Sequence, residues 1–158
     1  MNAAQIQDYT RRISQANKSQ IIVIIYDLAD QYLLDAVTAL EAGDTDTYTE
    51  NCHAGMQCIT HLLNALDDSY ELAQPLSELY AYMNREIGMA CARYDRERLT
   101  KVQGQLRELG GSFREVAKGD ASAPVMENSQ TVYAGLTYGK GSLHEDLYDE
   151  GNRRGYQA

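Results

Sequence analysis

The chain has 158 residues, of which 44% are hydrophobic, and a formal net charge of −9 at pH 7. This length is enough for one domain with its own core, and the negative charge argues against binding nucleic acid or anionic membrane surfaces. With no signal peptide or membrane-spanning run in the sequence, we expect a cytoplasmic protein without membrane insertion.

The first predicted helix covers residues 17–42. Asn17 and Gln20 have the spacing of a capping box, and Gly43 followed by Asp44 ends the pattern. Apolar residues then recur in steps of three and four, which is helical periodicity. This first stripe comprises Ile21, Ile25, Leu28, Tyr32, Ala36 and Leu40.

A second apolar stripe lies about 100° further round the same helix. It comprises Ile22, Tyr26, Ala29, Leu33 and Val37. Two stripes give more apolar surface than contact with neighbouring helices requires. We therefore expect the first stripe to face the other helices and the second to form a groove for an amphipathic partner. The alternative is that the chain's own neighbouring helices, N-terminal segment or tail bury the second stripe.

Three more helices are predicted at residues 45–67, 73–94 and 95–118, each with apolar residues in steps of three and four. Short connections between them predict an all-α, antiparallel up-down four-helix bundle over residues 1–118, preceded by an N-terminal arm. Residues 119–158 hold six of the twelve glycines and many tyrosines. We expect this extension to be a tail, partly disordered or docked on the bundle.

The sequence offers little support for catalysis or metal binding. A di-metal site in a helical bundle needs two Glu-x-x-His motifs, and only Glu50 and His53 form one, on the face turned away from the apolar stripe. The three cysteines lack C-x-x-C spacing, so we interpret them as buried or half-buried apolar residues. We expect no metal, no cofactor and no enzymatic activity.

Four segments in order resemble motifs of the flagellin export chaperones, the FliS family. Residues 17–27, NKSQIIVIIYD, resemble the capped helix start and its "LYD" run. Residues 39–44, ALEAGD, resemble an "AIEEGD" turn, and residues 78–85, ELYAYMNR, resemble "LYDYMxRR". Residues 106–113 resemble the closing "LxELRxxW" motif, with Phe113 in place of tryptophan. The similarity covers residues 9–117.

The resemblance implies a cytoplasmic chaperone that binds the disordered C-terminal segment of flagellin in an apolar groove, prevents premature polymerisation and supports type III flagellar export. The export apparatus and a co-chaperone or regulator are further candidate partners. The expected groove residues are Ile22, Ile25, Tyr26, Ala29, Leu33, Tyr80 and Met83. The residues expected to mask the groove in the arm or tail are Ile6, Tyr9, Ile13, Tyr133, Leu136 and Tyr138.

A different function fits the same pattern. A structural or regulatory helical bundle could use the extra apolar stripe of residues 17–42 to form a homodimer. The two functions differ in the state of the free protein, because only the second requires a permanent dimer.

Overall fold

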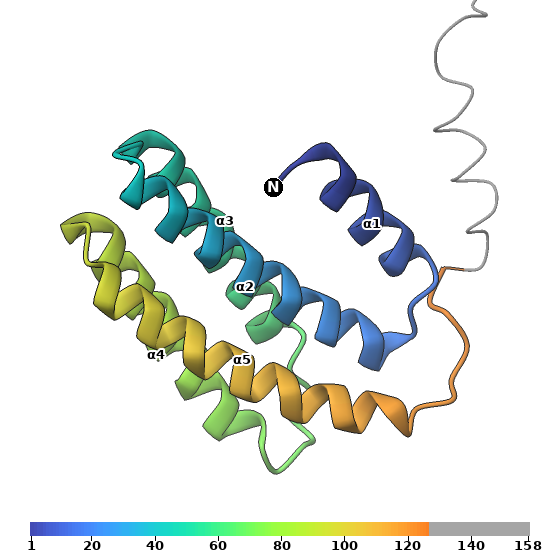
Figure 1. Cartoon of the computed structure of the whole chain (residues 1–158). Helices are drawn as coiled ribbons and strands as arrows, with labels where there is room; N and C mark the ends of the chain where they lie inside the picture. The colour runs from blue at the N-terminus through green and yellow to red at the C-terminus, as the bar shows by residue number, and fades with distance from the viewer. Residues whose placement is uncertain (127–158) are drawn as a thin grey trace, which may run out of the picture. The chain divides into compact units, whose positions relative to one another are not determined.

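The protein is described by a computed structural model, which covers residues 1–126. These residues form five helices and no strand (Figure 1). The helices are α1 (Ala3–Ser14), α2 (Lys18–Glu41), α3 (Thr45–Asn64), α4 (Ala73–Arg93) and α5 (Arg96–Lys118). The fold of this part of the chain is therefore all-α. None of these helices is long and apolar enough to cross a membrane.

Local sequence explains where most of the helices begin. The side chain of Asn17 accepts a hydrogen bond from the Gln20 amide, and Gln20 returns one to the Asn17 amide, so the capping box predicted for α2 is present. Asn2 and Gln5 form the same motif at α1, a helix that the sequence analysis did not predict. Asp side chains cap α3 and α5. The α3 helix ends at Asn64, three residues before its predicted end.

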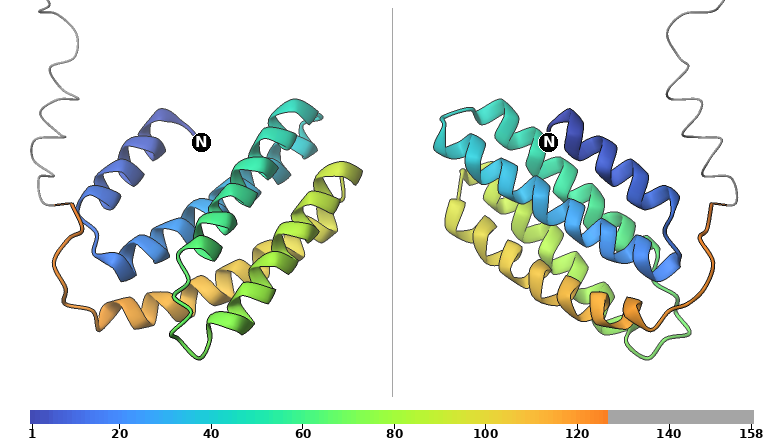
Figure 2. Two further views of the ribbon diagram at one scale, coloured as in Figure 1. Left: turned by 180° about the vertical axis from the view of Figure 1, so that it is seen from behind. Right: turned by 45° about the vertical axis from the view of Figure 1, so that its right-hand side comes forward.

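The helices α2 to α5 lie side by side and alternate in direction (Figures 1 and 2). Each of the four packs against two others, in the order α2–α3–α4–α5 and back to α2, whereas α1 packs mainly on α2. Side chains from all four helices fill one hydrophobic core. The largest fully buried residues are Tyr26, Tyr48, Tyr80, Leu33, Ile59, Leu62, Met83, Ile87, Leu99 and Leu106.

The predicted division of α2 into two faces was wrong. Tyr26, Ala29 and Leu33, expected to line an open groove, are at most 2% exposed and belong to the core. Ile25 and Leu28, expected to face the core, are only half-buried at its edge. The helix is rotated relative to the expectation, so that the middle of the second stripe enters the core, where Ala36 of the first stripe is also fully buried.

The core also contains two of the predicted groove residues on α4. Tyr80 is 1% exposed and Met83 is fully buried, so neither side chain is on an open surface. The cysteines behave as expected: Cys52 and Cys58 are buried, Cys91 is half-buried, and all three are free. Burial raises the pKa of the Cys52 thiol to about 12 and that of Cys58 to about 11.

Helix α1 is held on α2 largely by polar contacts. The Tyr9 hydroxyl donates to the backbone carbonyl of Asp27 at 3.3 Å. The carboxylate of Asp27 accepts hydrogen bonds from Arg12 of α1 and, at 2.6 Å, from Arg114 of α5. The apolar Ile6 of α1 remains 52% exposed. Val23 and Ile24 of α2 are buried, and they line a second cleft together with Arg12 of α1.

Candidate partner-binding cleft

An apolar cleft opens at one end of the helical body. The start of α2, the end of α3, the loop before α4, the start of α4 and the end of α5 meet there. We call this cleft, whose volume is about 390 Å³, the end cleft. Its lining residues are Lys18, Ser19, Ile22, Leu62, Ala65, Leu66, Asp67, Tyr70, Leu72, Ala73, Leu76, Tyr80, Phe113 and Val116.

The rim of the end cleft carries large hydrophobic side chains that face solvent. Tyr70 is 72% exposed, Leu72 is 66% exposed and Val116 is 67% exposed. Single exposed apolar residues are common on protein surfaces, but a group of them around an apolar depression is typical of an interaction site. Three of the eight large hydrophobic residues exposed in the described chain therefore gather at this cleft.

Aromatic rings from three helices form the floor of the cleft and support it. Tyr26 of α2 stacks on Phe113 of α5 with ring centroids 5.3 Å apart. The hydroxyls of Tyr26 and Tyr80 share a buried hydrogen bond of 2.5 Å. Desolvation by burial raises the pKa of both tyrosines, so both hydroxyls stay neutral at physiological pH. The floor is therefore uncharged and largely apolar.

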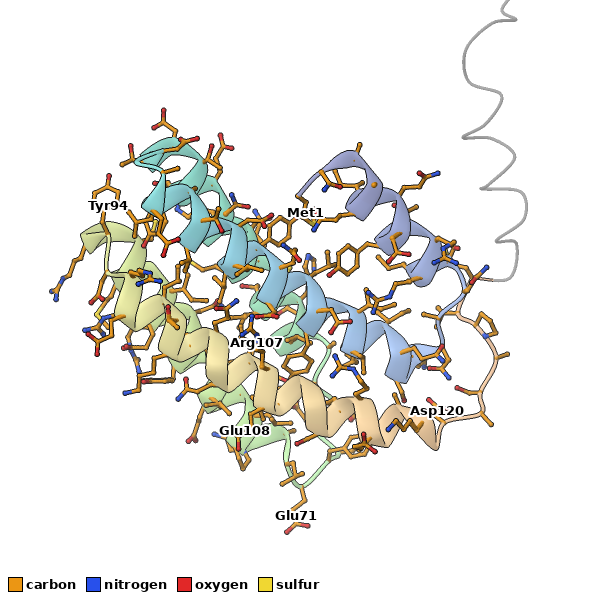
Figure 3. All side chains as sticks on the ribbon, viewed as in Figure 1. Met1, Glu71, Tyr94, Arg107, Glu108 and Asp120 are labelled. Carbon is orange, nitrogen blue, oxygen red and sulfur yellow. The ribbon has the colours of Figure 1, made fainter. Side chains whose placement is uncertain are left out.

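The loop between α3 and α4 leaves its apolar residues uncovered. Leu72 stands at the N-cap of α4, where its apolar side chain cannot cap the helix, and it lines the cleft instead. Asp67 shapes the loop through a hydrogen bond from the Ser69 amide. Glu71 lies at the tip of the loop (Figure 3). The acidic loop and Lys18 of α2 place opposite charges on two sides of an apolar opening.

The end cleft brings together only part of the predicted site. Ile22 and Tyr80 line it, and Tyr26 lies directly behind Tyr80. Ile25, Ala29, Leu33 and Met83 are not among its lining residues. The sequence did not lead us to predict the rim residues Tyr70, Leu72 and Val116 as part of the site. The position of Tyr70 and Leu72 just after the acidic turn at residues 67–68 could have indicated exposed apolar side chains there.

The residues predicted to mask the site are not part of the end cleft where the structure describes them. Tyr9 and Ile13 of α1 are half-buried, and Ile6 is exposed. None of the three lines the end cleft. Tyr133, Leu136 and Tyr138 lie outside the described residues.

Comparison with known proteins places this helical chain in a family. The family model described as "Flagellar protein FliS" matches residues 1–120. The chain is also 31% identical over 108 residues to the flagellar secretion chaperone FliS of Salmonella typhimurium, an alignment that covers 66% of this chain and 80% of the relative. The match extends across all five helices and the end cleft, and we conclude that the chain belongs to the FliS family of flagellar secretion chaperones.

Proposed function

We propose that this protein is a cytoplasmic export chaperone that binds the C-terminal segment of flagellin, keeps it from polymerising and supports its delivery to the type III flagellar export apparatus. The family and the name of the Salmonella relative support a flagellar secretion chaperone. This family is a chaperone family, so an enzymatic role is not expected. The choice of flagellin and of its C-terminal segment is our inference from the resemblance and from the apolar end cleft.

Within this proposal, α2 to α5 are an antiparallel four-helix bundle and α1 is an arm that moves when the partner binds. The domain is proposed to comprise residues 1–118. Residues 119–158 are its extension, including the tyrosines proposed as a mask. The alternation of helix directions and the limited packing of α1 support this division.

The single observation that carries the proposed binding mode is the exposed apolar rim over an aromatic floor. An amphipathic helix binds a groove by inserting a few apolar side chains and leaving its polar face in water. The end cleft offers space for such anchors, and its rim residues would lose their contact with water on binding. Anchors of this kind carry most of the binding energy in known interfaces.

Calorimetry with full-length flagellin and with flagellin lacking its last ~40 residues, a length within the range of segments that fold on binding, tests the partner. We expect heat only from the full-length form. Equal heats from both forms would refute the choice of segment.

Substitution at the rim tests the site. The double variant Leu72→Ser with Val116→Ser removes apolar area from the rim, and we expect at least tenfold weaker binding, which corresponds to about 1.4 kcal/mol. The matched control is Leu34→Ser, because Leu34 is 43% exposed on α2 but does not line the cleft. Equal losses in the double variant and in the control would exclude the end cleft as the binding site.

A further inference from the structure

The chain beyond α5 folds back onto the turn that joins α1 to α2. The side-chain amide of Asn17 donates hydrogen bonds to the backbone carbonyls of Asp120 at 3.0 Å and Ser122 at 3.4 Å. The backbone amide of Val125 donates to the carbonyl of Ala16 at 3.0 Å. We call residues 120–125 the clasp. Figure 1 shows this segment returning from the end of α5 to the α1–α2 turn.

A carboxylate anchors the clasp at its first residue. Asp120 accepts hydrogen bonds from the Ser19 hydroxyl on α2 and from the Ser122 backbone amide at 3.0 Å. These hydrogen bonds to the charged form lower the pKa of Asp120 to about 2. The anchor therefore stays ionised throughout the physiological pH range. Figure 3 labels Asp120 just beyond the end of α5.

The turn under the clasp is the pivot of α1. Helix α1 ends at Ser14 and α2 begins at Lys18, so any swing of α1 away from α2 requires backbone rotation in the residues between them. The clasp bonds two of these residues, Ala16 and Asn17. Because α1 packs mainly on α2 and leaves Ile6 exposed, the bonds at the pivot add to the few polar contacts that hold α1, which include the ion pair between the N-terminal ammonium of Met1 and Asp35.

We propose that the clasp is a latch for α1. With the clasp closed, the pivot is fixed and Arg12 of α1 stays at the cleft that Val23 and Ile24 line. With the clasp open, α1 can swing away and expose these two apolar residues. The chain after α5 thus controls a helix at the opposite end of the sequence. The proposal deepens the proposed function, since it says how the arm is held, but it is tested without any partner.

Hydrogen exchange of the full-length chain, measured by mass spectrometry without flagellin, tests the latch. Ser19→Ala removes the hydroxyl that holds Asp120, and Val125→Pro removes the amide that bonds to Ala16. In each variant we expect the α1 amides to exchange about tenfold faster, on the scale of one lost hydrogen bond, while α3 and α4 keep their protection.

Two controls separate a latch from general destabilisation. Ser112→Ala removes a hydroxyl that bonds only within α5, to the Glu108 carbonyl, and should leave α1 exchange unchanged. Ser19→Thr keeps a hydroxyl and should restore slow exchange. Unchanged α1 exchange in both Ser19→Ala and Val125→Pro would overturn the proposal, as would equal acceleration in all helices. Such a failure would not bear on the proposed function, which calorimetry with the unsubstituted chain tests separately.

Discussion

Removal of one hydroxyl from the Tyr26–Tyr80 pair should cost more stability than removal of both. Tyr26 and Tyr80 are 2% and 1% exposed, and each hydroxyl has the other as its hydrogen-bond partner. Tyr→Phe at one position keeps the ring and leaves the remaining hydroxyl buried without a partner. An unsatisfied buried group of this kind costs about 1–3 kcal/mol, whereas loss of both partners is close to neutral.

The two single variants should cost similar amounts, because the two rings are almost equally buried and their hydroxyls share one buried hydrogen bond. In Tyr26→Phe and in Tyr80→Phe alike, the remaining hydroxyl has lost its partner, and we expect a loss of about 1–3 kcal/mol. The double variant should lose less than about 1 kcal/mol, which gives a coupling energy of roughly 1 kcal/mol or more.

Urea unfolding followed by circular dichroism measures these free energies, provided that the denaturant slope is unchanged among the four proteins. If the costs of the single variants add in the double variant to within about 0.5 kcal/mol, the hydroxyls do not depend on each other and the reasoning is refuted.

Three further predictions rest on other contacts. Gly55→Ala should destabilise by about 1–3 kcal/mol in urea unfolding, since the new Cβ would lie 2.9 Å from Cδ2 of the buried Leu33, whereas Gly104→Ala, in open space, should gain up to about 1 kcal/mol. The Asp120 carboxyl should titrate near pH 2 by NMR. Because its pKa is lowered from 3.8, its stabilising effect is present above pH 3.8 and is lost as the pH falls through 2. A midpoint near 3.8 would show that the clasp is open. Ellman's reagent should modify Cys91 first in the native protein, because burial keeps the other two thiols protonated; equal rates for all three would contradict their burial.

The sequence predicted the helices of the described chain better than the orientation of α2. Capping residues and a period of three to four mark where a helix begins and ends, and these signals are local. The orientation depends on which of two equally apolar stripes the neighbouring helices cover. The polar residues of α2 held a signal for its orientation, since Asp27 and Gln31 lie on the side of the helix away from Ala29. The side that carries Ala29 and Leu33 is the one that faces the core.

The end cleft and the clasp could not be predicted in the same way. Residues from α2, α3, α4, α5 and the loop before α4 form the cleft, and single-helix periodicity says nothing about how helix ends meet. The clasp joins Asn17 to Asp120 and Ser122 through backbone carbonyls, which leave no pattern in side-chain composition. The sequence predicted only the capping role of Asn17, in which its Oδ1 accepts a hydrogen bond. It did not predict the hydrogen bonds that the Nδ2 of the same side chain donates to the clasp.

The carboxylate of Asp27 pairs with two arginines, only one of which belongs to α1. It bonds Arg12 of α1 and Arg114 of α5 through different oxygens. If α1 left α2 as proposed, Arg12 would move into water and Asp27 would keep Arg114 as its partner. The half-buried carboxylate would then still have a charged partner on the helical body. The residue that fastens α1 thus does not depend on α1 for the pairing of its own charge.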